Sequence, residues 1–443
     1  MDTNFKGKKV LILGLGINQG GLGSTRFFAK AGAKIRVTDL KTKEELKLSL
    51  DSLTDFPEIE YILGKHRYED IDWADLIIRN PALKPDNPYV LYAKEKGKQV
   101  EMDMGIFLQF VKPSQVIGVT GTKGKSTTAS MIYEILKAGG KEVIFAGNIG
   151  KSVLDTMPQV FENTLVVLEI SSFQLEAFGK HQISPKYALI TNIFPDHLNY
   201  YGSMKNYVQA KRIIAKYQTK NDFLFLRKGD LVTDQPEFLE GLPGNVVYFS
   251  TKDLPENFSP NLPGEHNLEN FAAAFSVAKT MGVKEQTITK TLEEFKGVEY
   301  RLELIYSKNG LKIYNDTAAT NPEATIQALQ ALPNSILICG GVNKNLSYED
   351  LAKALEKYPK DVYFIEGDAT NEILKELSAI SYQSSDKIQG TYSDLEKLLA
   401  DVKTVAKPGD IILFSPGAAS FNLFQNEFDR GRKFNEAVEK IFG

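Results

Sequence analysis

The segment VIGVTGTKGKSTT at residues 116–128 limits the possible folds of this chain more than any other segment. It begins as a short apolar strand, continues through a Gly-rich turn, and leads into a helix whose apolar residues recur at helical spacing (Met131, Ile132, Ile135 and Leu136). A strand, a glycine turn and a helix in this order predict an α/β fold built on a parallel sheet.

The Gly-rich turn has the chemistry of a phosphate-binding loop. Gly121 and Gly124 let backbone N–H groups turn toward an anion, the helix N-terminus adds its positive end, and Lys125 can reach terminal phosphates. Ser126 is then placed to hold Mg²⁺. Val119 stands where the usual pattern has its first glycine, so the loop is a variant, and an ordinary Gly-rich turn with a surface lysine is the alternative. The predicted phosphate-binding residues are Gly121, Thr122, Lys123, Gly124, Lys125, Ser126 and Thr127.

Length and composition narrow the class of protein. A chain of 443 residues is too long for one core, and roughly 150 residues per domain suggests three domains. A net charge of -3 gives no basic field for nucleic acid and no polybasic membrane tract, so we expect small-molecule partners. The single cysteine, Cys339, excludes an internal disulfide and is expected to be a buried hydrophobe. Since no leader or long apolar span is recognisable, we expect a cytoplasmic location.

Residues 1–103 begin as a Rossmann-type unit. The strand KKVLILGLG is followed by a glycine cluster, a helix and the strand KIRVTDL, which ends in Asp39. The fingerprint is imperfect because its third glycine would fall at Gln19, and Gly20 follows one residue late. A nucleotide diphosphate site is favoured over a purely structural unit, and Asn80, at the end of the strand DLIIRN, is expected to line the same crevice.

Residues 104–297 add polar groups at further strand ends. Glu169 follows the apolar strand TLVVL and predicts a second anchor for Mg²⁺, unless it merely marks the end of a buried strand. The strand YALITNIF leads to Asp196 and His197 at the same sheet edge. In the next helix, periodicity alone favours a snorkelling role for Lys211.

Residues 298–443 again alternate strands and helices, which predicts a parallel sheet with covering helices. Asp316, Lys344 and the segment SPGAAS at 415–420 lie at its predicted strand ends. Asn321 precedes Pro322 and is expected to be a structural helix N-cap.

Taken in order, TGTKGKST, GNIG, LEISSFQLE, TNIFPDH, the helix with Lys211, GEHN, EYRLE, NDTAATN and SPGAASF resemble the Mur ligases over the whole chain. The segment SSFQLE and the overall length are similar to the members that add D-glutamate. The resemblance implies three α/β domains: a Rossmann-like domain at 1–103 for a UDP-substrate, a P-loop ATPase-type central domain at 104–297 for ATP, and a Rossmann-like domain at 298–443 for the amino acid.

The same resemblance implies an ATP-dependent amide ligation in cytoplasmic peptidoglycan precursor synthesis. ATP would phosphorylate the terminal carboxylate of UDP-N-acetylmuramoyl-L-alanine, and the amine of D-glutamate would attack the acyl phosphate. One Mg²⁺ would lie near Ser126 and Glu169, and a second would be held by His197 and a carbamylated Lys211. Lys125, Glu169, His197 and Lys211 are the implied catalytic residues, and we expect the protein to act as a monomer.

Further sites follow from the family by position. The resemblance implies ATP contacts at Asn267, Asn270, Arg301 and Asp316; UDP-substrate contacts at Leu15, Asp39, Asn80 and Asn148; and D-glutamate contacts at Thr320, Lys344 and Ser420. Two departures stand out. Ala318 replaces a lysine that is frequent in the family, which leaves Lys344 as the clearest cation for the amino acid, and the first glycine loop is longer than usual.

Other functions compete with this interpretation. A folylpolyglutamate-synthase-like ligase shares the phosphate loop, but the additional N-terminal domain argues against it. A nicotinamide-dependent dehydrogenase is disfavoured by the imperfect glycine fingerprint beside an intact phosphate loop. A nucleotide-binding regulator without catalysis is disfavoured because Lys125, Glu169, His197 and Lys211 are all retained.

Overall fold

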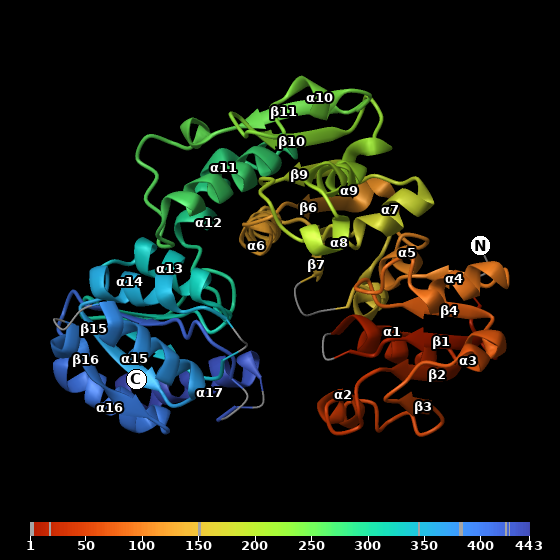
Figure 1. The fold of residues 1–443 in the computed structure, drawn as a ribbon. Helices are drawn as coiled ribbons and strands as arrows, with labels where there is room; N and C mark the ends of the chain where they lie inside the picture. The colour runs from red at the N-terminus through yellow and green to blue at the C-terminus, as the bar shows by residue number, and fades with distance from the viewer. Residues whose placement is uncertain are drawn as a thin grey trace. The chain divides into compact units, whose positions relative to one another are not determined.

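The computed structural model describes residues 4–16, 19–148, 152–343, 346–380, 384–420, 423–424 and 426–443. Strands in these ranges form three sheets (Figure 1). The chain divides into two compact units: unit 1 comprises Met1–Asn257 and Glu269–Leu292, and unit 2 comprises Phe258–Leu268 and Glu293–Gly443. The first two sheets lie in unit 1 and the third lies in unit 2.

The first sheet is entirely parallel, in the order β3-β2-β1-β4-β5. Its central strand, β1, is buried on both faces. Val10 and Ile12 belong to the same core cluster as residues of α1, whereas Leu11 and Leu13 pack with residues of α3 and α4. Alternating side chains therefore anchor helices on both faces, as in a doubly wound fold. The strands are β1 (Lys9–Leu13), β2 (Lys34–Asp39), β3 (Glu60–Leu63), β4 (Leu76–Arg79) and β5 (Gln99–Glu101).

The second sheet is also entirely parallel, in the order β11-β10-β9-β6-β8-β7. The central strand β6 is fully buried and lies between β8 and β9, so the carboxyl ends of these three strands meet at one edge. The strands are β6 (Val116–Thr120), β7 (Val143–Gly147), β8 (Leu165–Glu169), β9 (Tyr187–Ile190), β10 (Phe223–Arg227) and β11 (Asn245–Phe249).

The third sheet is mixed, in the order β12-β13-β17-β14-β15-β16. Strand β12 pairs antiparallel with β13, so the prediction of a purely parallel sheet was wrong for this edge. The cause is a tight hairpin at Asn309 and Gly310, both of which have positive φ. The strands are β12 (Glu303–Lys308), β13 (Leu311–Asn315), β14 (Ile336–Gly340), β15 (Asp361–Ile365), β16 (Ile388–Tyr392) and β17 (Ile411–Phe414).

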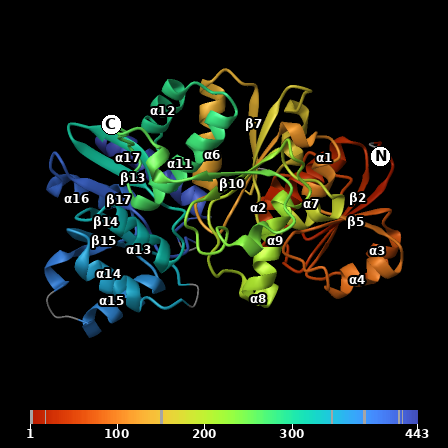
Figure 2. The same ribbon diagram turned by 90° about the horizontal axis from the view of Figure 1, so that it is seen from above.

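Helices cover both faces of the third sheet. Leu337 and Cys339 of β14 belong to the core cluster of α13, α14 and α15, whereas Ile336 and Ile338 belong to that of α16 and α17. Figure 2 shows α14 and α15 on one side of these strands and α17 on the other. Cys339 is fully buried, as predicted, and the side chain of Asn321 caps α13 by accepting from the N–H of Ala324 at 2.9 Å, also as predicted.

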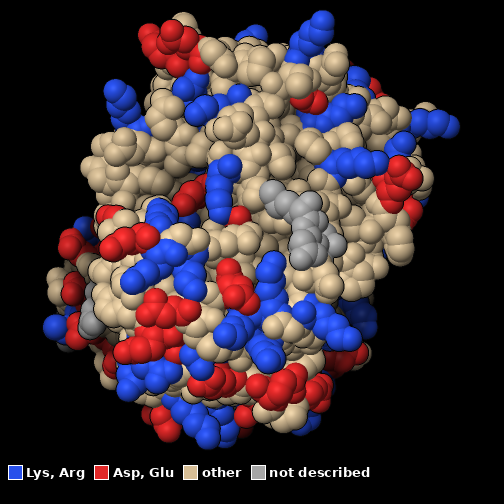
Figure 3. Space-filling model, turned by 90° about the vertical axis from the view of Figure 1, so that its right-hand side faces the viewer, with Lys and Arg blue, Asp and Glu red and all other residues tan. Residues whose placement is uncertain are grey.

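The helices complete the α/β fold, which confirms the predicted class. They are α1 (Gln19–Lys30), α2 (Lys47–Asp51), α3 (Tyr68–Trp73), α4 (Pro88–Glu95), α5 (Asp103–Phe107), α6 (Lys125–Ala138), α7 (Leu175–His181), α8 (Leu198–Tyr201), α9 (Met204–Lys216), α10 (Pro236–Leu239), α11 (Glu265–Thr280), α12 (Glu285–Glu293), α13 (Pro322–Ala331), α14 (Glu349–Lys357), α15 (Asp368–Ile380), α16 (Leu395–Val405) and α17 (Glu427–Phe442). Within the described ranges, none of the helices has the length and hydropathy to cross a membrane. On the face shown in Figure 3, positively charged side chains (Lys and Arg) lie among negatively charged ones (Asp and Glu).

Candidate active site

The phosphate loop connects β6 to α6 at the centre of the second sheet. Gly121 has φ +151°, and a Cβ at this position would lie 1.9 Å from Oγ1 of Thr191. Gly124 has φ +79°, and a Cβ there would lie 2.2 Å from Oδ1 of Asn270. Both positions therefore require glycine, because the side chains of Thr191, just after β9, and Asn270 of α11 leave no room for a Cβ.

The loop is anchored by a residue that the sequence interpretation did not assign. Asn192, which follows β9, accepts from the N–H of Lys123 at 2.9 Å through Oδ1 and donates to the carbonyl of Lys123 at 3.1 Å through Nδ2. Its own carbonyl accepts from the N–H of Thr122 at 2.9 Å. The hydroxyl of Thr191 also donates to the Lys123 carbonyl, at 2.6 Å. The end of β9 thus fixes the peptide groups of the loop.

Two residues predicted to bind ATP, Lys125 and Asn270, also contact the loop. The ammonium of Lys125 donates to the carbonyls of Gly121 and Thr122, at 3.0 Å each, and so lies against the loop. Asn270 of α11 contacts the loop at Gly124 and accepts from the hydroxyl of Thr128 at 3.2 Å. Ser126 and Thr127 lie half-buried in the first turn of α6.

Glu169 ends β8 at the same sheet edge and is 1% exposed. Its Oε1 accepts from Nδ2 of Asn148 at 3.0 Å, whereas its buried Oε2 has no hydrogen-bond partner among the described residues. An orphaned buried carboxylate oxygen fits a hard cation such as Mg²⁺, which prefers oxygen ligands. Asn148, predicted at the UDP-substrate, lies beside Glu169 because β7 pairs with β8.

Lys211 projects from α9 into the protein. It is 1% exposed, and its Nζ donates to the carbonyl of Gly121 at 2.8 Å and lies 4.8 Å from the ring centre of Tyr207. Burial, reinforced by the charge of Lys125, lowers the pKa of Lys211 to about 7. The snorkelling role suggested by periodicity was therefore wrong, and the side chain is a poorly solvated amine next to the phosphate loop.

His197 lies at the N-terminus of α8 with a positive φ of 52°. Its side chain is 44% exposed and its ring centre lies 5.0 Å from that of Phe173. In the described part of the chain, no three His, Cys, Asp or Glu side chains are grouped so that they could hold a metal ion. The predicted metal sites therefore depend on the hydroxyl of Ser126 and on a modified Lys211, and they stay predictions.

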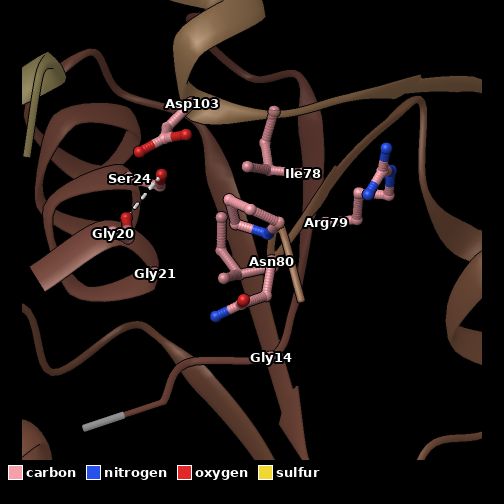
Figure 4. Close-up of a pocket in the computed structure, with 10 residues that line it drawn as sticks. Gly14, Gly20, Gly21, Ser24, Ile78, Arg79, Asn80 and Asp103 are labelled. Atoms are coloured by element: carbon pink, nitrogen blue, oxygen red, sulfur yellow. Dashed lines mark hydrogen bonds between the residues drawn. The ribbon is translucent and has the colours of Figure 1, made fainter. Parts of the chain in front are cut away.

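A small pocket opens at the carboxyl ends of β1 and β4, where the strand order of the first sheet reverses (Figure 4). Gly14, Gly20 and Gly21 are among the residues that line it, and the predicted residue Asn80 lies beside Gly14. Asp103, which the sequence interpretation did not select, faces the start of α1, and burial raises the pKa of its carboxyl. No local pattern marks Asp103, because its burial arises from packing of α5 against α7 and α1.

Two further residues predicted for the UDP-substrate, Leu15 and Asp39, are not among those that line this pocket. Leu15 is fully buried. Asp39, at the end of β2, accepts from the N–H of Gly16 at 2.8 Å and from that of Lys41 at 2.9 Å. Asp39 therefore holds the glycine loop in place by hydrogen bonds to its backbone.

In unit 2, Asp316 follows β13 and is buried. Its Oδ2 accepts from the hydroxyl of Ser415 at 2.7 Å, and its Oδ1 accepts from the N–H of Leu302 at 3.1 Å. Burial raises the pKa of Asp316 to about 7 despite these bonds. The exposed Arg301 lies between Tyr300 and Leu302, which have positive φ values of 64° and 44°, so Asp316 holds a strained turn that presents this arginine.

The remaining predicted contacts in unit 2 lie mainly at strand ends. The segment with Thr320 and the segment with Ser420 are joined because the N–H of Gly417 donates to the carbonyl of Ala319 at 2.9 Å. Ser420 is buried, whereas Thr320 is half-buried. Asn267 is buried and donates to the carbonyl of Pro263 at 2.6 Å. Lys344 lies outside the described residues.

Comparison of the sequence with known protein families identifies the family of this chain. The chain matches three domains in order: the Mur ligase MurD-like N-terminal domain at 8–101, the Mur ligase middle domain at 119–258, and the Mur ligase glutamate ligase domain at 300–417. This chain belongs to the Mur ligase family. The family that the motifs predicted is thereby confirmed.

Mur ligases of several organisms are similar over nearly the whole chain. A UDP-N-acetylmuramoylalanine--D-glutamate ligase of Roseiflexus sp. is 38% identical, with 98% of this chain and 99% of the relative covered. A protein of the same name from Caldicellulosiruptor bescii is 36% identical, with 99% of each covered.

Solved Mur ligases share the fold. The UDP-N-acetylmuramate-alanine ligase MurC of Thermotoga maritima is 21% identical with a TM-score of 0.58, covering 98% of this chain and 99% of its own. MurF of Acinetobacter baumannii is 16% identical with a TM-score of 0.61, covering 97% and 93%. At these identities the likeness concerns the fold alone.

Proposed function

We propose that this Mur ligase joins D-glutamate to UDP-N-acetylmuramoyl-L-alanine at the expense of ATP, in peptidoglycan precursor synthesis. The observation that carries the proposal is the similarity along nearly the full length to relatives named for this reaction, at 32–38% identity. The geometry of the phosphate loop supports the ATP part, because a glycine-requiring turn, a helix N-terminus and Lys125 meet at one sheet edge.

The reaction needs two transfers. A carboxylate oxygen of the UDP-linked alanine attacks the γ-phosphorus of ATP, ADP leaves, and an acyl phosphate forms. The amine of D-glutamate then attacks the acyl carbon, the C–N bond forms, and inorganic phosphate leaves. Lys125 and the N–H groups at the start of α6 offset the charge on the transferring phosphoryl group, where fixed donors act without reorganisation.

Bound Mg²⁺ would neutralise phosphate oxygens at this edge. Glu169 is the side chain best prepared to hold it, since its Oε2 is buried without a partner in the described structure, and Ser126 would supply a hydroxyl oxygen. His197 and Lys211 are proposed for a second ion, with Lys211 as a carbamate. Carbamylation needs a neutral amine, and the lowered pKa of Lys211 supplies one near neutral pH.

The other substrates are assigned to separate sheets. We place the UDP-substrate at residues 1–103, ATP at 104–297 and D-glutamate at 298–443, in a monomer of the cytoplasm that supports cell division through wall synthesis. Leu15, Asp39, Asn80 and Asn148 are proposed for the UDP-substrate; Asn267, Asn270, Arg301 and Asp316 for ATP; and Thr320, Lys344 and Ser420 for D-glutamate.

The test is phosphate release from ATP in the presence of UDP-N-acetylmuramoyl-L-alanine and one amino acid at a time. We expect release to require the UDP-substrate and to be fastest with D-glutamate among D-glutamate, L-glutamate, D-aspartate, L-lysine and meso-diaminopimelate. Faster release with another amino acid would refute the proposed specificity and retain the ligase chemistry. Release without the UDP-substrate would refute both.

A further inference from the structure

Arg430, at the end of the first turn of α17, is 1% exposed and is among the largest fully buried side chains of the described residues. All three of its guanidinium nitrogens donate. Nε donates to the hydroxyl of Thr317 at 2.9 Å, Nη2 to the carbonyl of Thr317 at 2.9 Å, and Nη1 to the carbonyl of Ala418 at 3.0 Å. One side chain therefore joins the segment after β13 to the segment after β17.

These acceptors are neutral. Within the described ranges no carboxylate lies close enough to form an ion pair with Arg430, but the charges of Glu427 and of the buried Asp316 attract its guanidinium from farther away. Burial lowers the pKa of Arg430 to about 10, so the guanidinium still carries its charge at neutral pH. Burying a charge is costly, and here only neutral acceptors in direct contact and this longer-range attraction offset the cost.

The rest of α17 reinforces the same contact. The hydroxyl of Thr317 donates to the carbonyl of Glu427 at 3.2 Å, and Nδ2 of Asn315 donates to the carbonyl of Gly431 at 3.0 Å. A Cβ on Gly431 would lie 2.6 Å from the Thr317 side chain, so the helix approaches the strand end as closely as glycine allows. Arg430 is thus anchored to Thr317 and Ala418, which lie shortly before Thr320 and Ser420 in the sequence.

We propose that Arg430 is a positioning residue for the amino-acid substrate: it fixes the segments 317–320 and 418–420 together, and its buried positive charge favours a dicarboxylic amino acid over a neutral one. This inference rests on the proposed function, because that function places the amino acid at Thr320 and Ser420. D-Glutamate and D-glutamine differ by one unit of charge at nearly equal size, so they separate attraction by charge from simple fit.

The experiment compares Arg430→Met, which removes charge and bridge, with Arg430→Lys, which keeps the charge but not the fork of donors. Arg432→Met is the matched control, since Arg432 lies on the same helix, is 56% exposed, and pairs only with Asp429 and Glu436 among the described residues. We would measure KM for D-glutamate, for the UDP-substrate and for ATP, the ratio of kcat/KM for D-glutamate to that for D-glutamine, and the melting temperature.

For Arg430→Met we expect KM for D-glutamate to rise about tenfold or more, and the D-glutamate to D-glutamine ratio to fall about tenfold, with KM for the UDP-substrate within about twofold. Arg430→Lys should raise KM but retain the ratio, and Arg432→Met should change neither. Equal changes in all three KM values, or an unchanged ratio in a folded Arg430→Met, would overturn the inference.

Two further outcomes are separable. If Arg430→Met does not fold, Arg430→Lys decides, because a selective rise in KM for D-glutamate supports positioning and a uniform change refutes it. If the unaltered enzyme rejects D-glutamate, the proposed function fails; the Arg430 inference then holds only if KM for the accepted amino acid rises selectively in the same variants.

Discussion

Replacement of Asn192 by alanine tests whether the end of β9 prepares the phosphate loop for ATP. The change removes two hydrogen bonds to the peptide groups of Lys123, at 2.9 and 3.1 Å, and leaves the backbone bond to Thr122 intact. Asn192 is buried. The variant therefore loosens the loop without altering its sequence.

The magnitude follows from those two bonds. A net contribution of about 0.5–1.5 kcal/mol for each gives about 1–3 kcal/mol of loop ordering, which ATP binding must then supply. We expect ATP to bind about tenfold more weakly, since roughly 1.4 kcal/mol corresponds to a factor of ten. Asn192→Asp keeps the acceptor for the Lys123 N–H but puts a carboxylate oxygen against the Lys123 carbonyl and adds a negative charge beside the phosphates, so it should weaken ATP binding more than alanine does.

The assay is calorimetric titration of ATP and, separately, of UDP-N-acetylmuramoyl-L-alanine. Asn245→Ala is the matched control, because Asn245 also donates two side-chain bonds to backbone carbonyls but lies at the amino end of β11. We expect the control to leave ATP affinity unchanged. Tighter ATP binding in Asn192→Ala would refute the reasoning, because it would mean that Asn192 competes with phosphate for the Lys123 N–H.

Three other perturbations address the titrating and metal-binding groups. Lys211→Ala should abolish turnover and be partly restored by formate or acetate, measured as phosphate release; activity without rescue would contradict a carbamate. Glu169→Gln should raise the Mg²⁺ concentration for half-maximal activity by about 10–100-fold in a Mg²⁺ titration, and an unchanged midpoint would exclude Glu169 as a ligand. The pKa of Asp316 is raised from 3.8 to about 7, so between these pH values the folded state binds a proton that the unfolded state has lost. The free energy of unfolding should therefore fall by about 1 kcal/mol for each unit by which the pH rises in this range. Asp316→Asn should flatten this slope in urea unfolding, and an equal slope in both proteins would contradict the assignment.

Local patterns predicted those features that depend on neighbouring residues. The strand, glycine turn and helix at 116–128 form β6, the loop and α6, and Asn321 with Pro322 caps α13 as expected. The hairpin β12–β13 had an equally local signal, because Asn309-Gly310 between apolar strands is typical of a tight hairpin turn, yet it was missed. That oversight is why the third sheet was predicted to be parallel throughout.

Features that depend on distant residues could not be predicted in this way. Asn192 contacts a loop that lies about 70 residues earlier in the chain, and Arg430 contacts Thr317 across 113 residues. Neither position has a periodicity or spacing that marks it, since a side chain reaching a backbone group elsewhere can come from any strand end or helix turn. Lys211 shows the same limit, because helical periodicity favoured a snorkelling side chain and did not indicate that its amine is buried.

Several residues other than glycine have a positive φ, which the sequence did not indicate. His197, Tyr300 and Leu302 all have positive φ, a conformation that is unfavourable by about 1 kcal/mol or more for residues with a Cβ. Each adjoins or is itself a residue predicted to act on ATP or metal, and Leu302 is held in place by a hydrogen bond to the buried Asp316. Glycine would relieve the strain but would also release the turn that presents Arg301. The same conformation occurs at Gln182, Asn309 and Asn334, where no site is predicted, so positive φ alone does not mark a site; at Arg301 the hydrogen bond from Leu302 to the buried Asp316 is what fixes the turn.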